Sequence, residues 1–313
     1  MAWTADAPSG TYRNFALSSK IRDAAVAASV FMPFMDTEPG YGKGKGGTLN
    51  LTRVGNLPLA DTVDENTELP SGRPLIDTVS LTPSEYGYKV KLTEFETNLT
   101  HFDLTNKVQR ALRDQLRLTM DRMCARALKQ TPIKVTSSSP TAVTFDTDGV
   151  MSSNPSGNLN VAHLGLMRDY LAGDLKCPPF ADGSYVLIGS TFALRGIKSD
   201  TNYREWFSRT TAQPMMTGEI PRIENIRIIE TNHFAALDNS IGSGGESGEA
   251  IMFGADAAFL ATVEEPELRR GLPMDLGRFF EVGWVGTTAA GLVWDLASQA
   301  RVLHWTAAAN VTP

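Results

Sequence analysis

Apolar and polar residues alternate in two stretches that frame a polar segment in the first third of the chain. The first stretch, residues 48–54, has the two-residue period of a half-exposed strand. The second covers residues 76–92, and Pro83 within it favours an edge or a bulge over a central strand. Together they predict a long β-hairpin. A two-stranded ribbon with so little apolar surface is marginal in water, so we expect this hairpin to lie on a neighbouring subunit.

A three- and four-residue apolar spacing then predicts one long helix over residues 103–130. Its apolar stripe consists of Leu104, Val108, Leu112, Leu116, Met120, Met123 and Ala127. Asp103 is a suitable N-cap, and Pro132 ends the helix. At the rise of an α-helix, this element would be about 42 Å long.

Shorter elements follow without regular alternation of strand and helix. The expected strands are 142–145, 185–189, 222–230, 250–254, 279–285, 289–294 and 300–305, and the expected helices are 161–171 and 190–197. This mixture predicts an α+β fold. The first 30 residues are polar and then alanine-rich, which indicates an arm with one short helix. The apolar run at 30–35 would anchor that arm.

Composition narrows the range of functions. The chain has 313 residues, a formal net charge of −6 and a pI of about 5.3, so it is no general nucleic-acid binder. Its two isolated cysteines, Cys124 and Cys177, form neither a disulfide framework nor a zinc site. We expect no signal peptide and no membrane span, because the longest apolar stretch, 282–294, is too short. These features favour a cytoplasmic protein.

Motifs for catalysis and cofactor binding are incomplete. The glycine-rich run fails the phosphate-loop pattern in both registers. We interpret it as a hinge built from Gly40, Gly42, Gly44, Gly46 and Gly47. The four histidines (His101, His163, His233 and His304) lack metal-ligand spacing, and residues 264–267 indicate a solvated acidic turn paired with Arg269 and Arg270. We therefore expect no enzyme site, no cofactor and no metal.

The long helix is the one unusual charge feature. After its Asp103 cap, it carries seven basic and two acidic residues, which gives this part a net charge of +5 within an acidic chain. Arg110, Arg113, Arg117, Arg122 and Arg126 are its arginines. They could form an ordinary solvated face, or they could face a polyanion or the acids of a neighbour's hairpin. Those acids are Asp61, Asp64, Glu65 and Glu68. Composition leaves both interpretations open.

The order of these elements resembles the major capsid (coat) proteins of tailed bacteriophages. Particular stretches that match one branch of that family are TLNLTR at 48–53, TELPSG at 67–72 and GEIPRIENIRIIET at 218–231, and the closing strands fit as well. The resemblance implies an N-terminal arm at 1–35 and an extended hairpin loop at 36–92. It further implies a peripheral domain at 93–157 with a spine helix at 103–130, an axial domain at 158–253, and a return to the peripheral domain at 254–313.

The resemblance also implies a function. Pentamers and hexamers of the chain would form an icosahedral head around double-stranded DNA, which they would touch non-specifically. Its partners would be a separate scaffolding protein, a portal and, in some heads, decoration proteins. The shell would assemble in the host bacterial cytoplasm and become part of the virion. The alternatives are the shell of a cellular encapsulating nanocompartment, an α+β enzyme without a recognised motif, and a tail or adhesin component, which the long helix disfavours.

Overall fold

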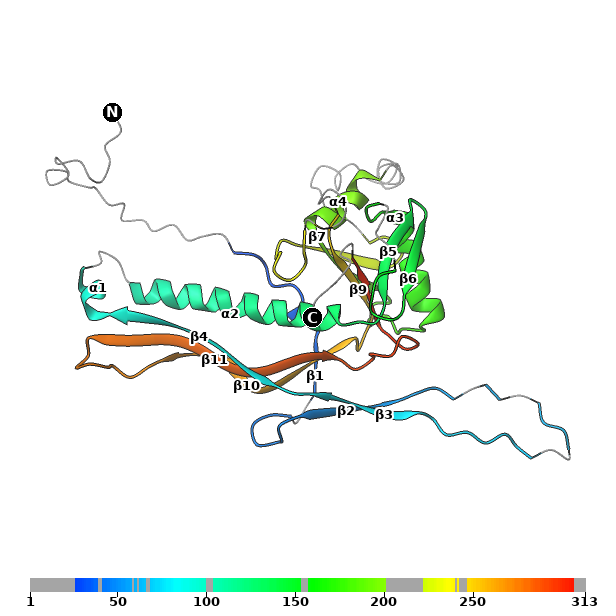
Figure 1. The fold of residues 1–313 in the computed structure, drawn as a ribbon, viewed down its shortest axis with the longest axis horizontal. Helices are drawn as coiled ribbons and strands as arrows, with labels where there is room; N and C mark the ends of the chain where they lie inside the picture. Colours follow the sequence, from blue (N-terminus) through cyan, green and yellow to red (C-terminus); the bar gives the residue numbers. More distant parts are fainter. Residues whose placement is uncertain are drawn as a thin grey trace.

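The body of the protein consists of two β-sheets and one long helix, and a thin two-stranded ribbon projects from it (Figure 1). The computed structural model describes residues 26–38, 41–57, 59–60, 62–65, 68–99, 104–152, 157–200, 222–239, 241 and 247–306. The short helix expected within the first 30 residues falls largely on residues 1–25, outside the described part of the chain.

A four-stranded sheet lies along the long helix. Its strand order is β1-β10-β11-β4, with bounds Asp36–Thr37, Ala258–Arg270, Phe279–Leu292 and Ser84–Thr93. The helix, α2, spans Leu104–Lys129 and confirms the predicted helix to within a residue at each end. Alternate residues of β11 are buried against it, including Phe280, Val282 and Trp284, which cluster with Leu112. The short helix α1, Glu94–Leu99, follows β4 at the far end of this layer (Figure 1).

A six-stranded mixed sheet forms the second layer. Its order is β6-β5-β12-β9-β7-β8, with bounds Ala142–Asp146, Lys134–Ser139, Val302–Trp305, Ala250–Phe253, Tyr185–Ser190 and Ile226–Thr231. Helices α3, Val161–Asp169, and α4, Thr191–Ser199, accompany it, and a π-helical turn, Tyr170–Asp174, extends α3. Every residue of β7 is buried, as expected for the centre of a sheet covered on both faces. Asn160 caps α3, and Ser190 caps α4.

The predicted hairpin divides into two parts. β2, Leu49–Val54, pairs with β3, Ile76–Leu81, but β4 pairs with β11 of the four-stranded sheet. The division falls at Pro83, which cannot donate a ladder hydrogen bond. The root of the β2–β3 ribbon also packs on its own chain, because Leu49, Leu51 and Leu81 are buried with Val293. The expectation that the whole hairpin needs a neighbouring subunit is therefore wrong for the root.

Strand β10 was missed by the sequence analysis. Residues 264–267, read there as a solvated turn, lie within this strand, at two register shifts that accommodate Pro266. Pro266 packs against Gly286 of β11, where an added Cβ would come within 2.7 Å of the proline ring. The expected ion pairing inside this segment is confirmed between Arg269 and Glu264. β5 was also missed. The strands expected at 279–285 and 289–294 form the single strand β11, and β8 begins four residues later than expected.

Candidate functional site

The distal part of the hairpin loop is exposed to solvent on all sides. Apolar side chains gather on it: Leu59 is 98% exposed, Leu69 is 75% exposed, and Val54, Leu57, Leu75 and Ile76 are each more than half exposed. The acids Asp64, Glu65 and Glu68 are exposed as well and form no ion pair with any described residue. Asp61 lies outside the described residues. An arm with unburied leucines and unpaired acids has the features of a binding surface.

One buried arginine fixes the root of this loop to the body. Arg53, in β2, is only 5% exposed. Its guanidinium donates to the Val293 carbonyl oxygen at 2.8 Å and to Asp77 at 2.6 Å, and it also pairs with Asp295. The planar guanidinium spreads its donors over two terminal nitrogens in a fixed fork, so it can reach acceptors on three different segments, whereas the three donors of an ammonium group share one nitrogen. Arg53 thereby joins the hairpin to the chain that follows β11.

We expect Arg53→Ala to lower the free energy of unfolding by about 2–3 kcal/mol, because three hydrogen bonds to a charged group are lost. Arg53→Lys should lie between Ala and the wild type. Urea denaturation measures both changes. The matched control is Arg73→Ala, an exposed arginine on the same loop, which should change stability by less than about 0.5 kcal/mol. Equal effects of Arg53→Ala and Arg73→Ala would contradict this role.

The glycine-rich run forms a turn between β1 and β2. The Lys45 N–H donates to the Gly42 carbonyl oxygen at 3.1 Å, and Gly44 (φ +79°) and Gly46 (φ +114°) occupy backbone conformations that favour glycine. Gly47 has no such conformation, and an added Cβ there would meet nothing within 4 Å. Gly40 lies outside the described residues. Two of the five predicted hinge glycines are therefore required by local geometry.

Gly46→Ala should destabilise the fold by about 1 kcal/mol, because alanine is strained at that positive φ. Gly47→Ala, one residue away, should be neutral or should stabilise by about 0.5 kcal/mol, through a more restricted unfolded chain. Chemical denaturation of the two variants gives the comparison. A larger loss for Gly47→Ala than for Gly46→Ala would contradict the assignment of the turn.

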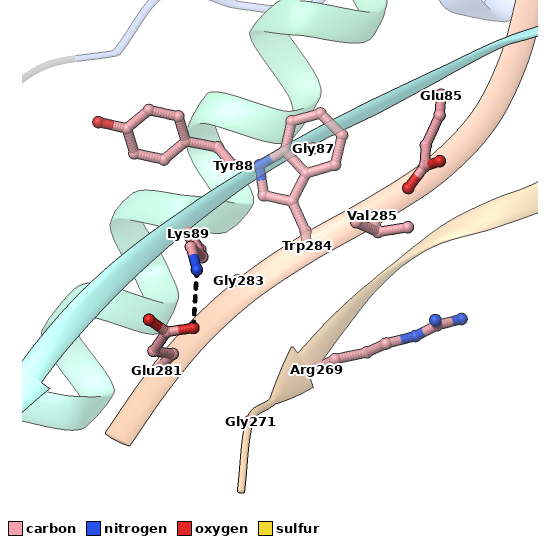
Figure 2. Close-up of a pocket in the computed structure, with 10 residues that line it drawn as sticks. All are labelled: Glu85, Gly87, Tyr88, Lys89, Arg269, Gly271, Glu281, Gly283, Trp284 and Val285. Carbon is pink, nitrogen blue, oxygen red and sulfur yellow. Dashed lines mark hydrogen bonds and ion pairs between the residues drawn. The ribbon is translucent and has the colours of Figure 1, made fainter. Parts of the chain in front are cut away.

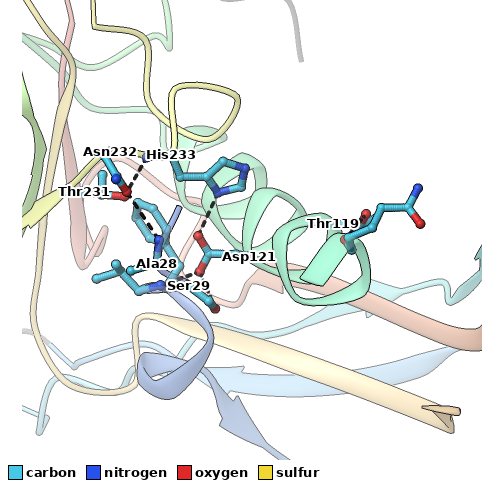
Figure 3. A network of polar contacts seen from close by, with 10 residues as sticks. Ala28, Ser29, Thr119, Asp121, Thr231, Asn232 and His233 are labelled. Carbon is cyan, nitrogen blue, oxygen red and sulfur yellow. Dashed lines mark hydrogen bonds and ion pairs between the residues drawn. The ribbon is translucent and has the colours of Figure 1, made fainter. Parts of the chain in front are cut away.

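The N-terminal arm is held by one buried carboxylate in the middle of α2 (Figure 3). Oδ1 of Asp121 accepts hydrogen bonds from the Ser29 hydroxyl at 3.1 Å and from the N–H groups of Val30 and Phe31 at 2.8 and 2.7 Å. Its Oδ2 lies 3.0 Å from Nδ1 of His233, in the segment after β8. Phe31 is fully buried beside the carboxylate. Asp121 thus connects the arm, the long helix and the six-stranded sheet.

A second buried polar cluster lies where the end of α2 meets the six-stranded sheet. Glu249 pairs with Lys129 of α2, accepts the Asp238 N–H at 2.8 Å and lies 3.5 Å from Nε2 of His304. The parallel pairing of β5 and β12 sets Lys134 beside His304, with its Nζ 3.3 Å from Nδ1. Lysine only donates, so Nδ1 accepts and the ring proton lies on Nε2, facing Glu249. Burial lowers the pKa of Lys134 to about 8.

The helix arginines divide between two sides of α2. At 3.6 residues per turn, Arg110, Arg113 and Arg117 lie within about 60° of one another, and Arg122 and Arg126 lie roughly opposite them. The sheet side of the helix is marked by Gln115, whose Oε1 accepts from the Trp284 indole at 3.1 Å. The first group therefore faces away from the sheet, and the second lies on the sheet side. All five are exposed, and they lie on two sides of the helix and not on one.

An open pocket of about 600 Å³ crosses the four-stranded sheet on β4, β11 and β10 (Figure 2). Its floor includes Gly87 and Gly283, and its charged residues are largely paired: Lys89 binds Glu281 at 3.0 Å, and Arg269 binds Glu264. No histidine, cysteine or serine is among the described residues that line it. We find no arrangement here that resembles a nucleophile with a base.

The remaining candidate chemistry lies in buried structural positions. His163, His233 and His304 are buried, and His101 lies outside the described residues. Cys124 and Cys177 are buried free thiols. Within the described ranges, no group of His, Cys, Asp or Glu is placed to hold a metal, and no helix is long and apolar enough to cross a membrane. The sequence analysis missed the pairs Asp121–His233 and Glu249–His304, because their members lie far apart in the chain.

No protein-family model matches the sequence, and no curated protein is similar to it. Solved phage structures do match. "Cyanophage Pam1 capsid asymmetric unit" has a TM-score of 0.74 at 17% identity and covers 99% of this chain and 100% of that one. "Acidic stable capsid structure of Helicobacter pylori bacteriophage KHP30" has a TM-score of 0.68 at 13% identity, covering 96% and 97%.

"Capsid of Ralstonia phage GP4" has a TM-score of 0.61 at 13% identity and covers 100% of both chains. These matches extend over both sheets, the long helix and the projecting ribbon, because nearly the whole chain is covered. The resemblance noted from the sequence is confirmed at the level of the fold. This chain has the α+β fold of tailed-phage capsid proteins over nearly its whole length.

Proposed function

We propose that this chain is the major capsid protein of a tailed phage. Copies of it assemble as hexamers and pentamers into an icosahedral head that encloses double-stranded DNA. The protein is structural and catalyses no reaction. In this proposal, residues 1–35 are an N-terminal arm, 36–92 the extended loop, 93–157 and 254–313 the peripheral domain, and 158–253 the axial domain.

One observation carries the proposal: a body with the capsid fold projects a loop that its own chain does not cover. The root of the loop is fixed by Arg53 and by the buried leucines of β2 and β3. Beyond Val54 the apolar and acidic side chains are exposed. Surface of this kind becomes stable when it is buried against another copy. Head-to-tail contacts close into rings where their rotation closes.

The arginines on the far side of α2 support contact with packaged DNA. Arg113 and Arg117 are exposed and form no ion pair with any described residue. A cationic row of this kind attracts phosphate without reading sequence. A separate scaffolding protein, a portal and decoration proteins are further partners in this proposal. The shell assembles in the host bacterial cytoplasm and becomes the virion capsid.

The test is to shorten the loop without disturbing its root. The Gly55 N–H donates to the Leu75 carbonyl oxygen at 2.7 Å, so residues 56–74 can be replaced by an Asn-Gly turn. Sedimentation velocity compares this variant with the full chain, both expressed with the genes that neighbour the protein's own. We expect shell-sized particles from the full chain and folded small species from the variant. Particles from both in equal yield would contradict the proposed role of the loop.

A further inference from the structure

A second groove lies between the C-terminal half of α2 and the strands β4 and β11. Its volume is about 380 Å³, which is within the range of small-molecule pockets. Arg122 and Arg126 of α2 line one side of it, and Ser84 of β4 and Thr82 just before that strand line the other. None of the described residues that line the groove is acidic. The groove therefore presents positive charge without a compensating carboxylate.

The two arginines are placed to act together. They are four residues apart, so one helical turn separates them, and their Cβ atoms are about 5–6 Å apart. Both side chains are exposed, and neither forms an ion pair with any described residue. Arg126 lies in the last turn of α2, where a cation also offsets the negative end of the helix dipole, but Arg122 lies one turn before it. The helix dipole therefore does not account for the pair.

Three uncharged side chains add hydrogen-bond donors to the same groove. The hydroxyls of Thr82 and Ser84 and the amide of Gln130 are exposed, and their side chains make no hydrogen bond to another described residue. Thr119 also lines the groove, but its hydroxyl already donates to the Gln115 carbonyl oxygen at 2.8 Å. The apolar side chains in the groove are buried or half-buried, so the free donors lie at its accessible side.

This set of donors fits a phosphoryl group better than a carboxylate. Each guanidinium carries five N–H donors in a planar fork, and the two hydroxyls and the amide add more. A carboxylate offers two oxygens and one negative charge. A phosphate monoester offers three terminal oxygens and a charge of about −1.5 to −2, which two cations can balance. Arginine forks bind phosphate oxygens in pairs, with charge-assisted hydrogen bonds.

We propose that the groove binds a phosphoryl group between Arg122 and Arg126, with Thr82, Ser84 and Gln130 as further donors. The bound group joins α2 to the root of the extended loop, because Thr82 lies between β3 and β4. Two sources share this chemistry: the backbone of a nucleic acid, and free phosphates such as polyphosphate. The site belongs to the single subunit, so it does not rest on the proposed shell function.

Isothermal titration calorimetry of the full chain with sodium pyrophosphate, at pH 7.5 and constant ionic strength, tests the site. We expect a dissociation constant on the order of 0.1 mM for the wild type. Arg122→Gln with Arg126→Gln should weaken binding at least about tenfold, because the charged donors are lost. Arg122→Lys with Arg126→Lys keeps the charge but lacks the forks, and should weaken binding about threefold.

The matched control is Arg113→Gln with Arg117→Gln, which removes the same charge from the other side of the same helix. It should change the dissociation constant by less than about twofold. Ser84→Ala alters the groove without touching α2 and should weaken binding about threefold. Circular dichroism checks that each variant is folded. No binding by the wild type, or an equal loss in the control pair, would overturn the proposal and leave the shell function standing.

A short DNA duplex distinguishes the two sources of the phosphoryl group. Competition between duplex and pyrophosphate in the wild type, with weaker duplex binding in Arg122→Gln with Arg126→Gln, would assign the site to the nucleic-acid backbone. An unchanged pyrophosphate dissociation constant in the presence of duplex would assign it to free phosphates. In that case, the duplex should lose affinity only in the Arg113→Gln, Arg117→Gln variant.

Discussion

Asp121→Ala should lower the free energy of unfolding by about 3–5 kcal/mol, the range for breaking a buried charged cluster by removing one partner. The substitution leaves the hydroxyl of Ser29, the N–H groups of Val30 and Phe31, and Nδ1 of His233 without their acceptor. Those groups stay buried or half-buried, so water cannot fully replace the carboxylate. Urea denaturation gives the change, and limited proteolysis should cut the arm earlier in the variant.

Two further variants separate the charge from the hydrogen bonds. Asp121→Asn keeps one acceptor oxygen for the arm and should lose only about 1–2 kcal/mol. Asp114→Ala removes an acid of the same helix that forms no ion pair with any described residue, and it should change stability by about 0.5 kcal/mol or less. If Asp121→Ala behaves like Asp114→Ala, the arm is not anchored by this carboxylate.

Glu249→Gln should also cost about 3–5 kcal/mol, since it removes the buried negative charge that compensates the half-buried Lys129 and the buried Lys134. Lys129 loses its ion pair, and Lys134, whose pKa burial already lowers to about 8, loses the carboxylate that favours its charged form. The matched control is Glu230→Ala, which breaks the more exposed pair with Lys198 and should cost about 1 kcal/mol or less. Equal losses in a denaturation series would contradict a structural role for the buried cluster.

The same cluster should make the fold sensitive to acid. Burial lowers the pKa of His304 below its ordinary 6.5, so the unfolded chain takes up a proton that the folded chain resists. Burial would raise the pKa of Glu249, but its contacts with His304 and Lys129 lower it below the ordinary 4.5. Both groups bind more protons when unfolded, so stability falls as pH drops below about 6.5 and falls further below about 4.5.

Denaturation midpoints at pH 7.5, 6.0 and 5.0 would measure this dependence, and His304→Gln should reduce the first step of the loss. Burial also lowers the pKa of His163, so that residue contributes to the same step. An unchanged midpoint from pH 7.5 to 5.0 in the wild type would show that His304 titrates normally. Each group can contribute at most about 1.4 kcal/mol per pH unit.

The elements with strong local signals were predictable. α2 carries a continuous apolar stripe over seven turns, so its bounds were predicted to within a residue at each end. β2 was found from the alternation of Leu49 and Leu51 with polar residues, and Arg53 lies on the same buried face in the structure. The sequence does not show that Arg53 is buried, because the two acids that pair with it, Asp77 and Asp295, come from other segments of the chain. Its burial depends on those distant partners.

β10 was hidden by its own composition. Acids, a proline and arginines in one stretch indicate a turn, and only pairing with β11 across two register shifts makes it a strand. Pro83 was correctly taken as a break in the strand pairing. In the structure it marks the point where the chain passes from the β2–β3 ribbon to the four-stranded sheet. Local propensity cannot show which strands will pair, because pairing is decided by tertiary contacts.

The buried anchor at Asp121 was the main omission among the candidate sites. A signal was present: Asp121 lies between Met120 and Cys124, on the apolar side of a helix whose other charged residues are nearly all basic. A lone acid in such a place requires a partner, since an uncompensated buried charge is costly. The partners come from residues 29–31 and 233, which sequence spacing could not connect. The two-sided placement of the arginines, in contrast, follows directly from helical geometry.

Negative-stain electron microscopy of the full chain, expressed with its neighbouring genes, tests the central claim most directly. The account predicts closed shells of uniform diameter, or rings of five and six subunits where closure is incomplete. A population that remains monomeric under these conditions, at concentrations where shell proteins assemble, would contradict a capsid function. The chain would then have the capsid fold but a different function.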